Sequence, residues 1–574
     1  MNKLESQRIR AISPESDSLK IGTGWKIKDL SKPQVLVESS FGDSHPGSVH
    51  LDELVNSVIK GISDEGGKGA RYFVTDICDG ISQGTDGINY SLPSRDMICN
   101  MMEIHGKSTG FDSGVFIASC DKSVPACLMA TGRLNLPSIV VTGGVMDAGP
   151  NLLTLEQIGA YDAQFKRGEI SEEKYLWYKH NACPSCGACS FMGTASTMQI
   201  MAEALGLMLP GSALMPATSP KLREVAYQAG RQSVQNAISG IKSHQLVTPD
   251  SFRNAILVHA AISGSTNSLL HLPAIAHEYG IEIDSDLFNK IHEDAHYLLN
   301  IRPAGQWPAQ FFYYAGGVPR IMEEIKSRLN LDCMTITGKT IGENLEILKK
   351  NNFYEECEEN LKRIGLNRTD VIREYDKPIG KNGTVAILKG NLAPLGSVVK
   401  HSAVPKQMFE ATLRARPYDS EEEAIDAILN KRINPGDAVI IRYEGPKGSG
   451  MPEMFYTTEA ISSDPQLNSS IALITDGRFS GASKGPAIGH VSPEAAEGGP
   501  IALLKENDLI YININKRILS IVGIDNVKLS ENEVESVLEQ RKKELKPFKS
   551  KYKSGVIKFY SEHANSPMKG GYMI

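Results

Sequence analysis

The sequence lacks an excess of positive charge, a long apolar run and an apolar core near its N-terminus. Its net charge is −6 at pH 7, which argues against a nucleic-acid or anionic-membrane surface as main partner. No stretch approaches the roughly 20 apolar residues that a membrane-spanning helix needs. Residues 1–18 mix both charge signs without an apolar segment, so we expect no secretory signal and predict a cytoplasmic protein.

Cysteine is scarce and unevenly placed, with 9 residues in all. An odd, clustered set is unlike an extracellular disulfide framework, and in a reducing cytosol it favours metal binding. Cys183, Cys186 and Cys189 form a C-x2-C-x2-C run among small residues, just before a predicted amphipathic helix at 198–208. Thiolates at this spacing suit iron-sulfur clusters. Three reduced cysteines capping a helix, or a zinc loop short of one ligand, are the alternatives.

The chain of 574 residues is too long for one core, so we expect two or more domains. In the first part, apolar strands alternate with loops and amphipathic helices, and a further strand is predicted at 254–262. This alternation predicts an α/β domain with a mainly parallel sheet, over residues 1–372. From residue 373 to 574 short β-rich runs separated by glycine, proline and asparagine predict a β-barrel-like domain.

Chemically reactive side chains follow several predicted strands, where α/β sheets carry their sites. Asp79 lies on a glycine-rich loop that suits Mg2+, and Cys120, Asp121 and Lys122 end the next strand. Ordinary turns would also favour aspartate and glycine at such positions. In the second domain, two glycine-rich loops carry Glu453 and Ser480; long loops inside a compact domain are commonly functional.

Six segments together resemble one enzyme family. They read CDKSVPACLMA, PSCGACSFMGTASTMQIMAEALG, GSTNSLLHLPAIAH, GNLAPLGSVVK, YEGPKGSGMPEM and TDGRFSGASKGPAIGHVSPEAAEGGPIALL. In this order they are similar to the dihydroxy-acid/6-phosphogluconate dehydratases, over residues 35–565. The resemblance implies a hydro-lyase that converts a 2,3-dihydroxy carboxylate to a 2-keto acid. It also implies an N-terminal α/β domain and a C-terminal β-barrel domain with the site between them.

The resemblance also implies cofactors and residue roles. An iron-sulfur cluster, of the 2Fe-2S or 4Fe-4S type, would be held by Cys120 and Cys189, and Ser480 would be the base. The implied Mg2+ ligands are Asp79, Asp121, Lys122 and Glu453, with the lysine carbamylated in family members. A metal on the carboxylate and C2 hydroxyl would stabilise the charge formed when the C2 proton leaves.

One position departs from the pattern of many family members. Dihydroxy-acid dehydratases and several sugar-acid dehydratases carry a third cluster cysteine in a Pro-Cys-Asn-like tripeptide, whereas this chain has Gly47 there. Glycine cannot bind iron. The 6-phosphogluconate branch lacks that cysteine and has two histidines at similar spacing, which His45 and His50 resemble. These histidines and Cys186 are therefore candidate neighbours of the cluster, although an ordinary strand-to-helix loop would also explain the histidines.

The substrate expected from the sequence is a polyhydroxy acid of low molecular weight. The segment after Cys189, SFMGTASTM, resembles sugar-acid dehydratases, so an aldonate is the favoured substrate. The segment TDGRFSG instead resembles the dihydroxy-acid dehydratases of branched-chain amino-acid biosynthesis, whose substrate is the alternative. A non-catalytic binding or regulatory relative without a cluster is an alternative of another class. Family resemblance predicts a homodimer or homotetramer.

Overall fold

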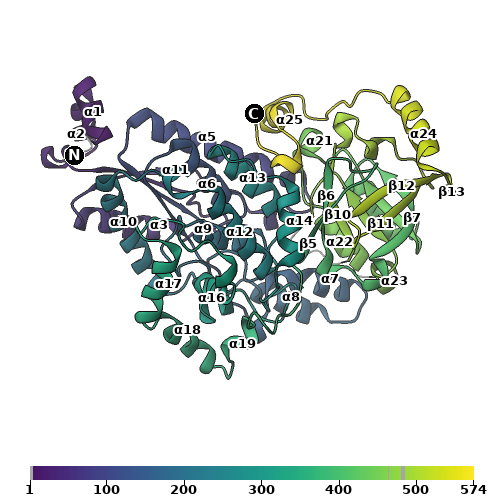
Figure 1. Cartoon of the computed structure of the whole chain (residues 1–574), viewed down its shortest axis with the longest axis horizontal. Coiled ribbons are helices and arrows are strands. Elements are labelled where there is room, and N and C mark those ends of the chain that lie inside the picture. Colours follow the sequence, from purple (N-terminus) through teal and green to yellow (C-terminus); the bar gives the residue numbers. More distant parts are fainter. Residues whose placement is uncertain (1–3, 463, 480–484) are drawn as a thin grey trace.

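The computed structural model of the chain describes residues 4–462, 464–479 and 485–574. It has two lobes, which Figure 1 shows in purple to teal and in green to yellow. The first lobe is built on a small parallel sheet with many helices, and the second on a larger mixed sheet. The predicted fold class, an α/β domain followed by a barrel-like β domain, is confirmed.

The first sheet is entirely parallel, with strand order β2-β1-β3-β4. Its strands are β1 (Gln34–Ser39), β2 (Lys68–Phe73), β3 (Ser113–Ala118) and β4 (Ser138–Thr142). Every residue of β1, β3 and β4 is buried, whereas the edge strand β2 is partly exposed. Helices therefore cover the sheet, as continuous apolar strands in a parallel sheet require.

Two helices pack unusually closely beside this sheet. Helix α3 (Leu51–Asp64) buries one apolar face and lies against α10 (Pro220–Ser239). A side-chain carbon at Gly61 would lie 2.0 Å from the Tyr227 carbonyl oxygen, and one at Gly230 would lie 2.2 Å from that of Val58. Only glycine permits this backbone contact. The contact fixes α3, whose N-terminus follows the loop that carries His45.

The strand predicted at 254–262 is wrong, because these residues belong to helix α12 (Pro249–Ile262). Thr248 accepts a hydrogen bond from the Ser251 amide and caps the helix, and Pro249 occupies its first turn. The residues from Asn254 to Ile262 are all buried, so the run is apolar on every side. An apolar run without periodicity does not distinguish a buried helix from a buried strand.

The second sheet has nine strands in the order β13-β12-β11-β7-β8-β9-β10-β6-β5 among the described residues. Neighbouring strands from β7 to β10 are parallel and the flanking pairs are antiparallel. Two backbone hydrogen bonds join Lys389, just after β5, to the region of β12. The Lys389 amide donates to the Arg517 carbonyl, just before β12, and the Leu519 amide, within β12, donates to the Lys389 carbonyl. These bonds draw opposite parts of the sheet together, so it curls into a half-barrel. The strands are β5 (Val385–Leu388), β6 (Gly396–Lys400), β7 (Glu410–Tyr418), β8 (Asp437–Ile441), β9 (Ala472–Thr475), β10 (Ala487–Ser492), β11 (Leu509–Asn513), β12 (Ile518–Ile524) and β13 (Val527–Lys528).

The end of the chain returns from the half-barrel to the first lobe. After α25 (Gly555–His563), the carbonyl oxygens of Gly570 and Gly571 accept hydrogen bonds from the buried Arg95 of α5 (Ser91–Thr109), at 3.0 and 3.1 Å. Figure 1 shows this C-terminal segment at the junction of the lobes. The two lobes are thus held together on the side of α5, which begins beside the candidate site.

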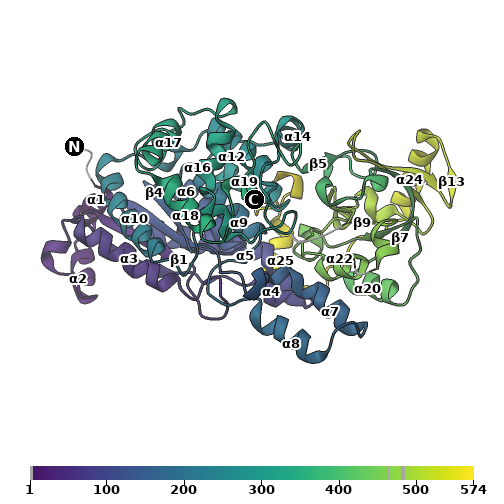
Figure 2. The ribbon, with the colours of Figure 1, turned by 90° about the horizontal axis from the view of Figure 1, so that it is seen from below.

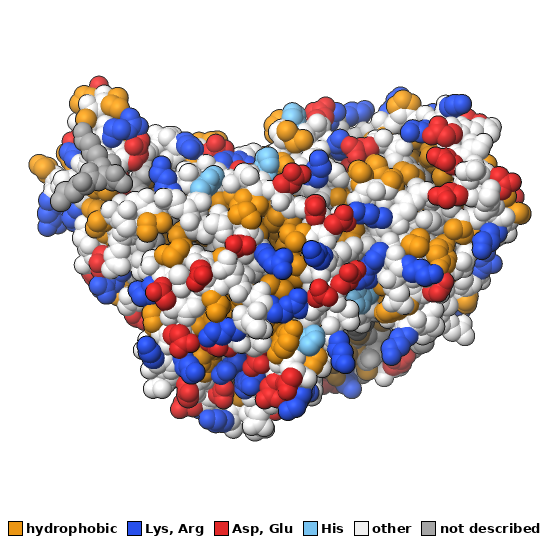
Figure 3. Space-filling view, viewed as in Figure 1, with side chains coloured by type: hydrophobic (Ala, Val, Ile, Leu, Met, Phe, Trp, Pro, Cys, Tyr) orange, Lys and Arg blue, Asp and Glu red, His pale blue; other side chains and the backbone are white. Residues whose placement is uncertain are grey.

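The remaining α-helices have the following bounds: α1 (Glu5–Ile12), α2 (Glu15–Gly22), α4 (Asp79–Ser82), α6 (Ser123–Leu134), α7 (Ile158–Lys166), α8 (Glu172–Asn181), α9 (Thr194–Ala204), α11 (Ser243–Leu246), α13 (Ser268–Glu278), α14 (Ser285–Asp294), α15 (Gln310–Tyr314), α16 (Gly317–Glu324), α17 (Ile341–Lys350), α18 (Phe353–Lys362), α19 (Arg368–Val371), α20 (Glu421–Leu429), α21 (Pro446–Ser449), α22 (Phe455–Ser462), α23 (Pro465–Asn468) and α24 (Glu531–Glu544). Within the described ranges, none of the helices is both long and apolar enough to cross a membrane. The face in Figure 3 carries interspersed positive and negative side chains.

Candidate active site

The loops that follow β1, β2 and β3 open at one edge of the parallel sheet and carry most of the predicted site residues. His45 follows β1, Asp79 follows β2, and Cys120 begins the loop after β3. The loop that carries Cys183, Cys186 and Cys189 lies at the same edge. Its Ala188 amide donates a hydrogen bond to the carbonyl of Gly144, just after β4, at 3.1 Å. Parallel strands place their carboxyl ends together, so this edge brings distant segments into one site.

Three carboxylates meet at this edge. Asp79, Asp121 and Glu453 each have a carboxylate oxygen within 4.8 Å of the others, and we call them the acid triad. Asp79 begins α4, Asp121 follows β3, and Glu453 comes from the half-barrel, between α21 and α22. The amide of Ala195 in α9 donates to Asp121 at 2.9 Å. The triad therefore forms only where both lobes meet.

Two buried cations neutralise part of the acid triad. Lys122 Nζ donates to Asp79 Oδ2 at 2.8 Å, and Arg478 donates to Glu453 Oε1 at 2.8 Å. Ser91 also donates to Asp79 Oδ2, at 2.7 Å. The second oxygen of that carboxylate, Oδ1, is buried and has no hydrogen-bond partner in the described part of the chain. A buried carboxylate oxygen without a donor is costly, and a bound cation would satisfy it.

Neutral side chains also hold Glu453. The amides of Asn267 and Gln83 donate to its two oxygens at 2.8 and 3.1 Å. The Asn267 amide also donates to Thr194 Oγ1 at 2.8 Å, which ties it to the start of α9. The predictions from sequence missed the roles of Arg478, Asn267 and Gln83, although the first two lie in segments that carried the family resemblance.

Burial and charge act differently on the members of the acid triad. Burial raises the pKa of Asp121 to about 7; Lys122 opposes this rise and the neighbouring carboxylates add to it. Burial opposes ionisation of Asp79 as well, but Lys122 and Arg478 outweigh it and lower the pKa of this carboxyl. The triad thus takes up a proton on Asp121 in preference to Asp79 when no further cation is present.

Cys120 and Cys189 lie close to the acid triad. Cys120 is 8% exposed, Cys189 is half-buried, and each thiol is an electrostatic neighbour of the other, of Asp121 and of Cys78. Burial raises the pKa of both thiols well above the ordinary value. A buried thiol of this kind becomes a thiolate when it binds a metal, because the metal replaces its proton.

Other predicted neighbours of the cluster lie in different surroundings. His45 is buried near Cys120, with Nε2 2.8 Å from Asp76 Oδ1. His50 points to a different partner, because its Nε2 lies 2.7 Å from the Gly143 carbonyl oxygen. The charged neighbours of both His50 and Cys186 include Glu53 and Arg223. Ser480, the predicted base, lies outside the described residues.

A pocket of about 500 Å³ opens onto the acid triad. Its wall also contains Cys189 and apolar side chains, among them Leu155, Ile158, Phe191 and Phe455. Residues of α7 and α8 contribute to the same wall, and Figure 2 shows these helices projecting beside α22 of the half-barrel. The pocket thus combines carboxylates, a thiol and apolar surface, which is a suitable setting for a ligand of low molecular weight.

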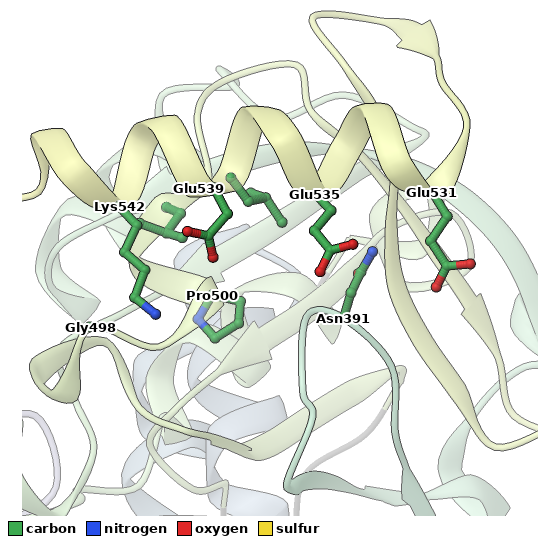
Figure 4. Close-up of a pocket in the computed structure, with 9 residues that line it drawn as sticks. Asn391, Gly498, Pro500, Glu531, Glu535, Glu539 and Lys542 are labelled. Atoms are coloured by element: carbon green, nitrogen blue, oxygen red, sulfur yellow. The ribbon is translucent and has the colours of Figure 1, made fainter.

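A second, smaller pocket is also acidic, but its carboxylates are exposed and no thiol lines it among the described residues. It has a volume of about 210 Å³ and lies between α24 and the loops of the half-barrel. Figure 4 shows Glu531, Glu535 and Glu539 along the helix face above Asn391. All three glutamates are exposed. We call this the α24 groove.

Comparisons with known proteins agree with this arrangement. Family models described as dihydroxy-acid/6-phosphogluconate dehydratase N-terminal and C-terminal match residues 32–344 and 370–571. The chain belongs to the dihydroxy-acid/6-phosphogluconate dehydratase family. It is 42% identical to a dihydroxy-acid dehydratase of Methanosarcina barkeri, over 96% of this chain and 97% of the relative. Proteins of the same name from Acetivibrio thermocellus and Agathobacter rectalis are 41% and 42% identical, over 96% of this chain.

The family confirms two predictions from the sequence. The chain is a dehydratase, that is, a hydro-lyase, and the resemblance to this family is correct. The favoured sugar-acid specialisation receives no support from these relatives, which are dihydroxy-acid dehydratases by name. The choice between substrates therefore depends on the pocket as well as on the segment after Cys189.

Proposed function

We propose that this dehydratase acts on a 2,3-dihydroxy carboxylate with a branched carbon chain, such as 2,3-dihydroxy-3-methylbutanoate, and forms the 2-keto acid. The observation that carries the proposal is the pocket in which the acid triad and Cys189 face the same space. The full-length similarity to three dihydroxy-acid dehydratases supports the substrate class. A sugar acid, which the segment SFMGTASTM favours, is the second candidate substrate.

The chemistry of the pocket wall supports this order. An aldonate carries a hydroxyl group on almost every carbon, and each buried hydroxyl needs a polar partner. More of the pocket lining is apolar than polar, and Leu155, Ile158 and Phe191 contribute to it, although polar side chains such as Tyr175 and Lys179 also line the pocket. Such a surface suits the methyl groups of a branched acid, and burying them is favourable by about 0.8 kcal/mol per carbon.

The proposed cofactors are Mg2+ and an iron-sulfur cluster, and the residues fit both. Asp79, Asp121 and Glu453 would hold Mg2+, since oxygen ligands suit this ion and Asp79 Oδ1 has no donor within the ranges that the structure describes. Lys122 as an ammonium cannot bind a cation, so its role as a ligand requires the carbamylated form. Cys120 and Cys189 would bind the cluster through thiolates.

When bound, these groups supply Lewis acidity and positive charge to the substrate carboxylate and hydroxyl groups. The residues of the chain then have distinct tasks. Ser480 would accept the C2 proton. Arg478 and Asn267 would fix the Glu453 carboxylate, because each donates to its Oε1 at 2.8 Å. Helices α7 and α8 would limit the access of water to the pocket. The enol that remains after loss of the C3 hydroxyl would then tautomerise to the keto acid.

The test is anaerobic purification with iron and sulfide quantitation, followed by 2-keto acid assays on 2,3-dihydroxy-3-methylbutanoate and a panel of aldonates. We expect iron and sulfide in the protein and turnover of the branched acid at least tenfold above every aldonate. Cys189→Ser should lose iron and activity together, whereas Cys333→Ser, at a buried thiol in the first lobe, should keep both. Iron-loaded protein that turns over only an aldonate would contradict the substrate proposal. Absence of iron after reconstitution would contradict the cofactor proposal.

A further inference from the structure

One buried histidine beside the thiols has a ring nitrogen for which the described part of the chain offers no hydrogen-bond partner. His45 lies in the loop between β1 and α3, and its side chain is 1% exposed. Its Nε2 lies 2.8 Å from Asp76 Oδ1 and 3.0 Å from Ser48 Oγ. Its Nδ1 is buried and has no hydrogen-bond partner among the described residues. Buried polar atoms in native proteins are rarely left so, which makes Nδ1 a candidate ligand atom.

The hydrogen bonds identify which ring nitrogen carries the proton. A carboxylate only accepts, so Asp76 requires a proton on Nε2. The Ser48 hydroxyl donates to the Gly42 carbonyl at 2.8 Å, so its oxygen is also free to accept from Nε2. With the proton on Nε2, the neutral form of the ring, which is the form that binds metals, presents a lone pair on Nδ1.

The free nitrogen and the thiol of Cys120 border the same small volume. A side-chain carbon added at Gly47 would lie 3.0 Å from His45 Nδ1 and 3.3 Å from Cys120 Sγ. Glycine leaves this volume open, and the ring nitrogen faces it. The Gly187 amide donates to the Pro46 carbonyl at 2.8 Å, which ties the histidine loop to the loop that carries Cys189.

The surroundings of His45 are those of a metal-binding histidine. Such a histidine commonly donates its other N–H to a carboxylate, which fixes the ring and its tautomer. Asp76 has this role for His45, and it is held in turn by the Ser123 hydroxyl, which also accepts from the Cys120 amide at 3.2 Å. The histidine and the thiol are therefore positioned by one hydrogen-bonded network.

We propose that His45 binds the iron-sulfur cluster through Nδ1, as a third protein ligand beside Cys120 and Cys189. This inference rests on the proposed function, because it requires a cluster at these two thiols. Imidazole is a suitable iron ligand, and exchanging a thiolate for it removes a negative charge and raises the reduction potential of the cluster. A glycine at position 47 then fits the site, since the histidine replaces the missing thiolate.

Two other groups compete for this role. Cys78 is half-buried and is an electrostatic neighbour of both Cys120 and Cys189. His50 also has a buried Nδ1 without a partner in the described ranges, yet its charged neighbours are Glu53, Arg223 and Asp52, and not the cluster thiols. His50 is therefore a matched control of the same residue type, and Cys78 is the competing ligand.

The test uses anaerobically reconstituted full-length protein with 15N-labelled histidine, and pulsed electron paramagnetic resonance of the reduced cluster. We expect strong nitrogen hyperfine coupling in the wild type, its loss in His45→Gln, and its retention in His50→Gln and Cys78→Ser. His45→Cys should keep the iron content, lose the coupling and lower the reduction potential, so the test does not depend on the stability of one variant.

Each outcome separates this inference from the proposed function. A wild-type cluster without histidine coupling, or coupling that persists in His45→Gln, would overturn the role of His45 while leaving the hydro-lyase proposal intact. Loss of the cluster in Cys78→Ser, with no histidine coupling in the wild type, would assign the third position to Cys78. Protein without iron after reconstitution would overturn both proposals together.

Discussion

The acid triad and the α24 groove each contain three carboxylates, and they differ in almost everything else. The triad is gathered from three distant segments and is largely buried, and two cations and two side-chain amides are among its hydrogen-bond donors. The groove glutamates follow one another along a single exposed helix face. A carboxylate in water needs no partner, whereas a buried one does. Burial, and not the number of acidic residues, therefore marks the site.

The largest expected effect follows from removing one charge from the acid triad. Glu453→Gln keeps the shape of the side chain but removes the carboxylate that Arg478 contacts at 2.8 Å, leaving the guanidinium only Asp79, at 3.7 Å, as a carboxylate neighbour among the described residues. We expect kcat to fall by about 10²–10³-fold, since one charge-stabilising group in a buried site is worth that much in catalysis. Magnesium content and steady-state kinetics measure the effect.

The matched control for this variant is Glu535→Gln in the α24 groove, which also replaces one carboxylate by an amide. Circular dichroism checks that both variants are folded, because breaking a buried ion pair destabilises a protein by about 3–5 kcal/mol. If folded Glu453→Gln kept kcat within tenfold of the wild type, the acid triad would not be the catalytic metal site.

A smaller effect is expected from an uncharged residue beside the acid triad. Asn267→Ala removes the amide that donates to both Glu453 and Thr194 at 2.8 Å. Partners that orient metal ligands typically affect metal affinity or activity by about 10–100-fold. We therefore expect Mg2+ to bind 10–100-fold more weakly, as measured by titration calorimetry. Unchanged Mg2+ affinity would show that the amide does not orient the carboxylate.

The sequence predicted the parts of the site that follow strands, for a physical reason. Asp79, Asp121 and Lys122 follow strands of a parallel sheet, and such positions converge at one edge in any fold of this type. Arg478 follows β9 in the second lobe and Asn267 follows helix α12, so neither position by itself indicates a contact with the edge of the first sheet. Their roles depend on the docking of two lobes, which no local pattern encodes.

The fold shows the same limit. Alternating apolar strands and amphipathic helices predicted the α/β lobe, but 254–262 is helical where a strand was expected. The run is buried on all sides, so its hydrophobicity has no period to detect. The cap at Thr248 and the proline at 249 were the available local signals. Periodicity therefore identifies elements with one exposed face better than those in the interior.

The next prediction concerns the pH dependence of Mg2+ binding to the acid triad. Burial raises the pKa of Asp121 to about 7, from an ordinary value of 3.8. Below pH 7 a proton occupies this carboxyl in the metal-free protein, and Mg2+ must displace it. Affinity should therefore fall by up to about tenfold for each pH unit below 7 and level off above it. Calorimetry in buffers of different ionisation enthalpy measures the released proton.

Asp121→Asn provides the comparison for this pH profile. The variant binds Mg2+ more weakly at every pH, and its profile should be flat between pH 6 and 7 because the titrating carboxyl is gone. In the metal-free wild type the folded state holds a proton on Asp121 that the unfolded chain releases at lower pH, so the contribution of this carboxyl to stability should decrease as pH rises from 4 to 7. A slope that survives in Asp121→Asn would assign the proton to another group.

The smallest effect is expected in the α24 groove itself. Glu535→Gln and Glu539→Gln change exposed side chains of a helix that is anchored by the buried Val534 and Leu538. Substitutions at such surface positions usually change the free energy of unfolding by less than about 0.5 kcal/mol. Thermal unfolding and keto-acid assays should show both variants equal to the wild type within error. A loss of activity above threefold in either variant would mean that the groove communicates with the site, and burial would then be insufficient to separate the two acidic regions.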